Sequence, residues 1–258
     1  MVGRLSMVVC LLVAIGWVVE CPAQVKAGDT QAAAAAAPAT RAAGKIEPLP
    51  DEKGKPFAVV QRAKKALELD GKLDEGLGEP TLTSFYSEDT GKAVKQNVQT
   101  QVWLRYDDEN LYVIAKMLEP AMDELQATTT ERDGEVWQDD DLEIFLDPAK
   151  KADPAEYFQI IVNPAGTIAD QRGAPDVSGD SAWDCKGCKV KTGKGKDFWV
   201  VEMAVPFQAI GVKGPVAGKH WGANFGRDRK AGDGENSSWV NIGADWHQPE
   251  EFGHIAFE

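Results

Sequence analysis

Residues 136–148 read Val136-Trp137-Gln138-Asp139-Asp140-Asp141-Leu142-Glu143-Ile144-Phe145-Leu146-Asp147-Pro148. From position 142 onward the side chains alternate in character, which is the period-2 pattern of a half-buried strand. The apolar face consists of Leu142, Ile144 and Leu146. The opposite face consists of Asp141, Glu143, Phe145 and Asp147. We therefore expect a strand that packs its first face on a core and keeps a carboxylate, Glu143, on its outer surface.

Trp137 lies just ahead of this strand and would border the face that carries Glu143. Proteins hold polar rings such as sugars with a flat aromatic ring beside a fixed carboxylate, because the ring faces stack and the hydroxyls need directed partners. An ordinary antiparallel strand with a solvated outer face and a core Trp contains the same residues. The segment alone leaves both interpretations open.

Short strand patterns separated by turns continue along the chain, and helix patterns are scarce. Three pairs of segments flank polar or Gly-containing turns and predict hairpins: 97–106 with 110–117, 157–163 with 167–171, and 188–192 with 197–205. Single strands are expected at 57–61, 66–69, 221–228, 238–242 and 253–257. Residues 207–210, after Pro206, form the one expected helical turn. This pattern predicts an all-β fold, a jelly-roll-like antiparallel β-sandwich with at most one short helical turn.

The N-terminal part of the chain carries no strand pattern. Residues 1–23 have the features of a secretory signal peptide: Arg4 in a positive n-region, an apolar run at 7–19 and a small residue, Ala23, at the cleavage position. The run is too short to span a bilayer comfortably, and an uncleaved anchor is the alternative. Residues 24–56, rich in Ala and Pro, are expected to be a disordered linker. The folded domain is therefore placed at 57–258, in a secreted or periplasmic protein without a membrane span after signal removal.

Charge and cysteine content narrow the classes of partner. The formal net charge is −13, and it is unchanged by loss of residues 1–23, which contain one Arg and one Glu. Nucleic acid is not expected as a partner, because phosphate binding needs basic patches. After the signal the chain keeps only Cys185 and Cys188. In an exported chain this close pair favours a local disulfide, with a redox or metal role and free thiols as the alternatives.

Several short phrases follow one another in a recognisable order between Leu69 and Glu258. They are Leu69–Glu75, Val102–Val113, Arg132–Asp133, Trp137–Asp147, Tyr157–Gln159 with Asn163 and Gly166, Trp199–Pro206, Trp221–Phe225 with Arg227, and Trp246–Gly253. In this order they resemble the family 9 carbohydrate-binding modules and the wider group of DOMON-like sandwiches. The resemblance implies a β-sandwich without catalytic machinery, in which Glu202 and Arg227 would form a structural ion pair.

The resemblance also implies a sugar site. In the sugar-binding members two Trp side chains clamp a terminal sugar, and polar side chains bind its hydroxyls. By motif, Trp137 and Trp246 match the two clamp positions, and Glu143 matches the hydrogen-bonding Glu. Gln159 stands where some members place an Arg, so the hydroxyl contacts there would differ. The opening phrase lacks the Trp that usually follows it, a departure that concerns packing rather than the site.

The strand pattern adds a second amide side chain to this expected site. Within residues 157–163, Gln159 and Asn163 point to the face opposite the apolar side chains. If this segment pairs with residues 142–146, both amides share a polar surface with Glu143. The expected carbohydrate-binding residues are therefore Trp137, Trp246, Glu143, Gln159 and Asn163.

Cofactors and catalysis would depend on other residues. Some members hold structural calcium, for which the candidates here are Asp139 and Asp140, followed by Asp141, Glu119, Asp123 and Glu131. Haem-binding relatives use axial Met, His or Lys, and the available residues are His220, His247, His254, Met117 and Met203. A glycosidase would need a paired acid and base, and nothing in the spacing brings Glu143 and Glu202 together. No cofactor is expected to be essential.

We therefore expect an exported, non-catalytic module that binds mono- or oligosaccharides, including chain ends. Its role would lie in polysaccharide breakdown or glycan capture, alongside a separate glycoside hydrolase. A haem-binding electron-transfer domain of the DOMON type is one alternative. A sugar-free protein-interaction sandwich is the other.

Overall fold

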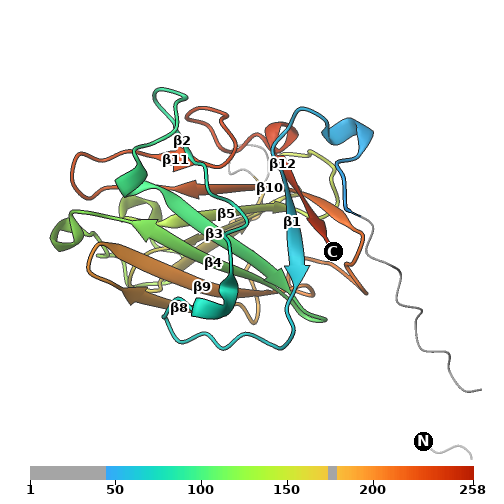
Figure 1. The fold of residues 1–258 in the computed structure, drawn as a ribbon, viewed down its shortest axis with the longest axis horizontal. Helices are drawn as coiled ribbons and strands as arrows, with labels where there is room; N and C mark the ends of the chain where they lie inside the picture. Colours follow the sequence, from blue (N-terminus) through green and yellow to red (C-terminus); the bar gives the residue numbers. More distant parts are fainter. Residues whose placement is uncertain (1–44, 174–178) are drawn as a thin grey trace, which may run out of the picture. The chain divides into compact units, whose positions relative to one another are not determined.

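The computed structural model of this protein describes residues 45–173 and 179–258 (Figure 1). The strands are β1 (Phe57–Arg62), β2 (Tyr86–Ser87), β3 (Thr100–Tyr106), β4 (Asn110–Leu118), β5 (Leu142–Asp147), β6 (Phe158–Val162), β7 (Ile168–Arg172), β8 (Lys189–Lys194), β9 (Phe198–Pro206), β10 (His220–Arg227), β11 (Ser237–Ser238) and β12 (Gly253–Phe257). Short 3-10 turns lie between them: η1 (Pro50–Glu52), η2 (Glu75–Leu77), η3 (Gln96–Val98), η4 (Met122–Glu124), η5 (Val136–Gln138) and η7 (Pro249–Glu251).

The strands form two sheets that are joined by β1. One sheet, here called the site sheet, has the order β7-β6-β5-β10-β12, and the other, the back sheet, has the order β3-β4-β9-β8. Strand β1 pairs in parallel with β12 over residues 57–60 and with β3 over residues 61–62, so it belongs to both (Figure 1). The paired strands within each sheet are antiparallel. The predicted β-sandwich is confirmed, with β1 as a parallel link between the sheets.

The core lies between the inner faces of the two sheets. The predicted apolar face of residues 142–146 is part of it, because Leu142, Ile144 and Leu146 are fully buried. The same cluster contains Trp221 from β10 and Trp199 from β9. Packing of this kind supplies the main favourable term for folding, since each large apolar side chain contributes about 1.5–3 kcal/mol when it is buried.

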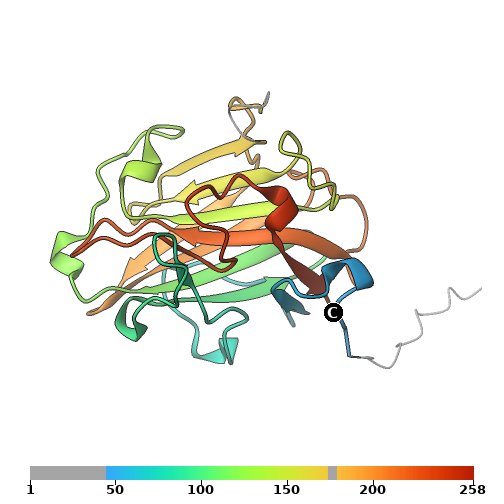
Figure 2. The same ribbon diagram turned by 90° about the horizontal axis from the view of Figure 1, so that it is seen from above.

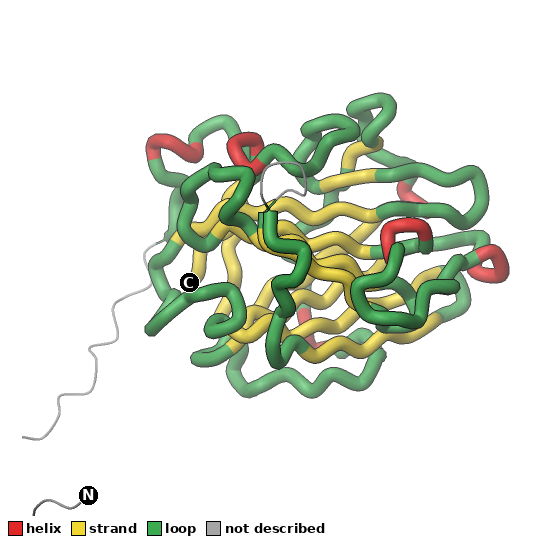
Figure 3. The backbone as a smooth tube through the Cα atoms, turned by 180° about the vertical axis from the view of Figure 1, so that it is seen from behind, coloured by secondary structure: helices red, strands yellow, loops and turns green. Residues whose placement is uncertain are grey.

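The predicted hairpins are present, and several local predictions need correction. Residues 66–69 form no strand, because Leu67 and Leu69 pack on the outer face of the back sheet without pairing their backbone. The strand predicted at 238–242 shortens to β11, and residues 207–210 form a turn instead of a helix. The described residues contain several 3-10 turns where one helical turn was predicted, as the red segments of Figure 3 show. No helix in these residues is long and apolar enough to cross a membrane.

The opening phrase of the family pattern covers the outer face of the back sheet. The Glu202 Oε2 atom accepts hydrogen bonds from the backbone N–H groups of Asp70 (2.9 Å) and Gly71 (2.7 Å). Gly71 has a φ of +80°, and a Cβ there would collide with the carbonyl oxygen of Thr192. Glu202 thus anchors this covering segment, and the predicted ion pair between Glu202 and Arg227 is wrong.

Arg227 instead pairs with a carboxylate that the sequence pattern did not connect to it. Its guanidinium is buried, and Nη2 lies 3.1 Å from Glu119 Oε2. Nη1 donates to the carbonyl oxygens of Val98 and Leu118. Arg229 reaches the same Glu119 carboxylate at 2.7 Å. This buried network ties the end of β10 to the end of β4.

The folded part begins before the predicted boundary at Phe57. The side chain of Glu52, in η1, is buried and bonded to Lys150 Nζ (2.7 Å) and His220 Nδ1 (2.9 Å). The predicted signal peptide 1–23 and residues 24–44 of the predicted linker lie outside the described residues. The remaining part of that linker, residues 45–56, therefore includes an anchored turn, because Glu52 is held by partners on the domain.

Candidate functional site

A cavity of about 510 Å³ lies on the outer face of the site sheet. Figure 2 looks toward this region, where the red loop before η7 lies over β10. The cavity is lined by Glu88, Asp133, Trp137, Glu143, Phe145, Gln159, Ile161, Ala169, Asp170, Gln171, Ser181, Asp228, Asn236, Ala244, Trp246 and His247. Four of the five predicted sugar-site residues are among them, namely Trp137, Trp246, Glu143 and Gln159.

The floor of the cavity follows from the register of three antiparallel strands. Phe145 of β5 lies opposite Gln159 of β6, which lies opposite Gln171 of β7. Glu143 in turn lies opposite Ile161. Residues opposite each other in a ladder point to the same face of the sheet, so their side chains form one continuous surface. Because Leu142, Ile144 and Leu146 of β5 point into the core, the side chains between them, Glu143 and Phe145, point into the cavity.

A chain of side-chain hydrogen bonds crosses this floor. Gln171 Nε2 donates to Gln159 Oε1 at 2.6 Å, and Gln159 Nε2 donates to Glu143 Oε2 at 2.6 Å. The amide of Gln159 is thereby fixed in one orientation, because its oxygen and its nitrogen both have partners. The carboxyl of Glu143 is held in place before any ligand arrives.

Two indole rings border the cavity in different ways. Trp137 lies on η5 and is 46% exposed. Trp246 is only 6% exposed and packs edge-to-face on Phe145, with 6.4 Å between ring centroids. Its ring lies against Gly226 of β10, where any Cβ would overlap it. Trp137 therefore offers an open ring surface, whereas Trp246 forms a fixed wall.

Three buried carboxyl groups meet at one end of this floor. One oxygen each of Asp141, Glu143 and Asp228 lie within 4.8 Å of one another. Lys230 Nζ lies 2.9 Å from Asp228 Oδ2. Burial raises the pKa of Glu143 to about 8, with the charge of Asp228 as a further cause. Burial and the carboxylate of Glu143 likewise raise the pKa of Asp141 well above its ordinary value. This carboxyl trio therefore holds protons that exposed acids would have lost.

The residues predicted for calcium do not fit a cation. Asp139 Oδ1 accepts from the N–H and hydroxyl of Thr128, and Oδ2 accepts from the N–H of Thr129 and from Asn163 Nδ2. Asp140 accepts from the backbone N–H groups of Gln126 and Lys230. Hydrogen-bond donors occupy the directions that a calcium ion would need. Asp139 and Asp140 instead fix the loops around η5, which carries Trp137.

Asn163 belongs to the same loop framework and not to the cavity. It is buried, and its Nδ2 donates to the Thr129 carbonyl and to Asp139 Oδ2. Its Oδ1 accepts from the N–H groups of Ala165 and Thr167. All of its hydrogen-bonding capacity is therefore used inside the protein, and the prediction that it reads sugar hydroxyls is wrong.

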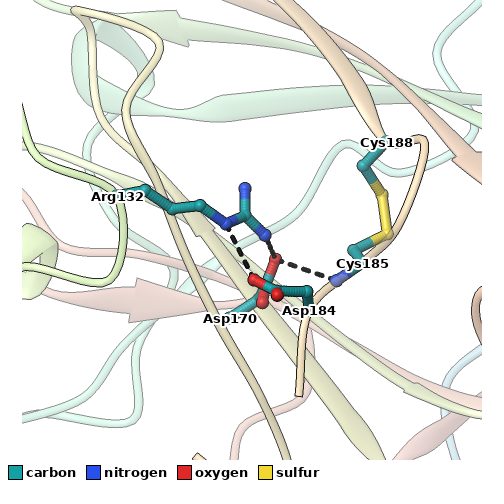
Figure 4. The surroundings of a disulfide bond; sticks show 5 residues. All are labelled: Arg132, Asp170, Asp184, Cys185 and Cys188. Carbon is teal, nitrogen blue, oxygen red and sulfur yellow. Dashed lines mark hydrogen bonds and ion pairs between the residues drawn. A yellow bond between two sulfur atoms is a disulfide. The ribbon is translucent and has the colours of Figure 1, made fainter. Parts of the chain in front are cut away.

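The predicted disulfide lies beside Arg132, Asp170 and Asp184 (Figure 4). Cys185 and Cys188 are bonded, with 5.5 Å between their Cα atoms. The backbone N–H of Cys185 donates to Asp170 Oδ2 at 3.3 Å. Arg132 pairs with the same Asp170 oxygen and with Asp184 Oδ1 (3.0 Å). The disulfide loop and Arg132 therefore position Asp170, which lines the cavity.

Several residues named for the haem and glycosidase alternatives lie far from one another in the described structure. Met117 and Met203 are buried in the core between the sheets, and His220 bonds Glu52. Glu202 contacts the segment that covers the back sheet, so it does not share the cavity with Glu143. An acid and base pair for glycoside cleavage must flank one bond, which these two residues cannot do.

Several cavity residues escaped prediction. The alternation of residues 141–147 already places Phe145 beside Glu143, so Phe145 could have been included. Asp228 joins the site because β10 pairs with β5, where Gly226 lies opposite Glu143. That pairing joins residues distant in the chain, and no local pattern indicates it. Glu88 and Asn236 come from loops beside β2 and β11, for which the sequence carries no signal.

Comparisons with known proteins agree with this architecture. The family described as "Carbohydrate family 9 binding domain-like" matches residues 69–258. The family 9 module from Caldicellulosiruptor kristjanssonii in complex with glucose is 19% identical, with a TM-score of 0.60 over 79% of this chain and 96% of that one. Its cellotriose complex is also 19% identical, with a TM-score of 0.59 over 79% and 94% of the two chains.

A putative carbohydrate-binding protein from Bacteroides uniformis has the same level of similarity. It is 19% identical, with a TM-score of 0.58 over 78% of this chain and 99% of that one. No curated protein matches the chain. At this level of identity the structural likenesses establish the shared fold.

Proposed function

Since the chain belongs to the carbohydrate family 9 binding domain-like family, we propose that it binds carbohydrate non-covalently in the cavity on the site sheet. The observation that carries this proposal is the exposed ring of Trp137 beside the carboxyl of Glu143, which Gln159 holds in place. The solved neighbours described as glucose and cellotriose complexes support the same class of ligand.

The geometry suits one face of a sugar ring. The C–H groups of a pyranose would stack on the Trp137 ring, and its hydroxyls would bond Glu143 and Gln159. Each such hydrogen bond contributes about 0.5–1.5 kcal/mol net. Together with the stacked area, these contacts suit micromolar binding, about −8 kcal/mol. Trp246 would close the side of the cavity and offer its indole N–H.

The proposed wider role is that of an exported module. The expected signal at residues 1–23 and the Cys185–Cys188 disulfide support export to an oxidising compartment. An exported sugar-binding module would hold polysaccharide, including chain ends, for a separate glycoside hydrolase. Export is tested by the N-terminal mass of the protein recovered from culture medium or periplasm, which should lack residues 1–23.

Calorimetric titration of the folded protein with mono- and oligosaccharides tests the binding proposal. Trp137→Ala should lower the affinity at least about tenfold, because the stacking surface is lost. Trp183→Ala is the matched control, since Trp183 is a partly exposed indole that packs on Phe158 outside the cavity lining. Equal affinity in the wild type and the Trp137 variant, or no saccharide binding by a cooperatively melting protein, would refute the proposal.

A further inference from the structure

The cavity on the site sheet is strongly acidic. Its lining contains Glu88, Asp133, Glu143, Asp170 and Asp228, and no Lys or Arg occurs among the lining residues that the structure describes. Asp141 adds a sixth carboxyl directly behind Glu143 and Asp228. A neutral sugar needs a few oriented acceptors, and this number of acids exceeds that need. The excess of acids favours a ligand that carries positive charge.

Nearby cations neutralise only part of this charge. Arg132 pairs with Asp170 and lies 3.5 Å from Asp133, and Lys230 pairs with Asp228. Within residues 45–173 and 179–258, no ion pair is formed by Glu88, Asp141 or Glu143. Burial and the neighbouring acids disfavour the anion of Glu143 and thereby raise its pKa. A positive group in the cavity would reverse this penalty.

Two lining side chains also carry a polar atom that has no hydrogen-bond partner among the described residues. Asp170 and Trp246 are each more than nine-tenths buried and line the cavity. Their Asp170 Oδ1 and Trp246 Nε1 atoms are unpartnered, as is Asp141 Oδ2 in the carboxyl trio. A buried polar atom without a partner is costly, so such atoms indicate where a ligand supplies groups. At the cavity, Asp170 Oδ1 calls for a donor on that ligand, and the N–H of Trp246 calls for an acceptor such as a hydroxyl oxygen.

We propose that the preferred ligand of this cavity is a sugar bearing a primary ammonium group, an amino sugar such as glucosamine, with the ammonium held beside Glu143, Asp228 and Glu88. This inference rests on the proposed carbohydrate function and specifies its substrate class. An ammonium group carries three donors and no acceptor, which matches a set of carboxyl oxygens. The rings of Trp137 and Phe145 add faces that attract cations. Uronic acids, which carry a carboxylate, are excluded by the same charge.

The carboxyl trio suits an ammonium group better than a divalent metal ion. Calcium requires six to eight oxygen ligands, and here Lys230 Nζ already lies 2.9 Å from Asp228. Gln159 Nε2 further occupies one oxygen of Glu143. The ammonium group of Lys230 already contacts one of these acids in the folded protein. The ammonium group of a ligand would need fewer oxygen partners than a calcium ion does.

The test compares ligands that differ at one nitrogen. Calorimetric titrations in EDTA use glucosamine, N-acetylglucosamine, glucose and glucuronic acid on the wild-type protein. Glucosamine should bind at least about tenfold more tightly than N-acetylglucosamine, whose nitrogen is uncharged, and glucuronic acid should not bind. Binding should also release protons, seen as a heat that depends on the ionisation enthalpy of the buffer, because Glu143 ionises beside the ammonium.

Variants and a metal titration separate the possible outcomes. Asp228→Asn should reduce the ratio of glucosamine to glucose affinity. Asp108→Asn is the control and should leave that ratio unchanged, because Asp108 is an exposed acid between β3 and β4 that does not line the cavity. Glucose binding as tightly as glucosamine would overturn the amino-sugar inference and leave the carbohydrate function intact. Binding of no saccharide would overturn both. Calcium binding without sugar that competes with glucosamine would overturn the inference in favour of a metal site.

Discussion

Trp137 is one of two large apolar side chains exposed in the described part of the chain. Its backbone position is not loose, because Asp139 and Asp140 follow directly and bind the N–H groups of the segment 126–129. Burial alone would raise the pKa of Asp139, but hydrogen bonds from the N–H groups of Thr128 and Thr129 hold that pKa below its ordinary value. An exposed indole on a pinned turn is preorganised for a ligand, since little freedom is lost on binding.

The proton on Glu143 should make the ligand-free protein less stable as pH rises. The folded state keeps this proton up to about pH 8, whereas the ordinary pKa in the unfolded chain is 4.5. The unfolding free energy therefore falls between these values, by a few kcal/mol at the order-of-magnitude level. Glu143→Gln stays neutral and should flatten the profile measured by denaturant unfolding from pH 5 to 9. Some slope should remain, because burial also raises the pKa values of Asp141 and Asp228.

An exposed acid provides the control for this pH dependence. Glu68 is exposed, so Glu68→Gln should leave the slope of stability against pH unchanged. Parallel profiles for the wild type and Glu143→Gln would mean that Glu143 ionises normally in the folded protein.

Gly226 should be essential to the shape of the cavity. A Cβ at this position would overlap the ring of Trp246, so Gly226→Ala must displace that wall. Overpacking of this kind costs about 1–3 kcal/mol. Thermal melting and saccharide titration should both show losses. Gly222→Ala, on the same face of β10, meets the Asp147 side chain at 3.3 Å and should have a smaller effect on both. Equal effects would show that Trp246 adjusts without cost.

At the scale of elements, the back sheet depends on the segment that covers it. Glu202 accepts two backbone hydrogen bonds from this segment, and bonds to a charged group contribute about 1.5–3 kcal/mol each. Glu202→Ala should therefore lower the unfolding free energy, and Glu202→Gln should lower it less because it keeps one acceptor oxygen. Saccharide affinity should be unchanged in both variants. A loss of affinity in either would indicate that the two sheets are coupled.

Local patterns predicted the elements well and their partners only in part. The alternation in β5 and the turns of three hairpins were sufficient to place most strands and the face that carries Glu143. The parallel pairs of β1 and the pairing of β10 with β5 join distant segments, which local patterns do not indicate. The pairing of β10 with β5 brings Asp228 to the site. Asn163 was misassigned because alternation gives a face and not a hydrogen-bond partner. Trp137, Trp246 and Glu143 were predicted from the family resemblance, and all three line the cavity. A family pattern carries information about the shared fold, including which distant strands pair.

At the scale of the whole molecule, the two outer faces of the sandwich have different environments. The outer face of the back sheet is covered by Leu67, Leu69, Leu73 and Leu77, which pack around Trp103. The outer face of the site sheet instead carries the acidic cavity. Covering one face leaves the other as the surface for ligand binding. The N-terminal turn η1 is also part of the domain, because Glu52 contacts His220 of β10 and His254 of the neighbouring β12.

The anchoring of η1 predicts where the stable domain begins. A protein starting at Lys45 keeps Glu52 with Lys150 and His220, whereas one starting at Phe57 leaves these two side chains without their carboxylate. Loss of such buried charge-assisted bonds costs about 1–3 kcal/mol. Denaturant unfolding at pH 7 should therefore show lower stability for the shorter protein, and Glu52→Gln in the longer one should reproduce much of the loss. Equal stability of the two proteins would return the domain boundary to Phe57. Saccharide affinity should be the same in both, because η1 does not line the cavity.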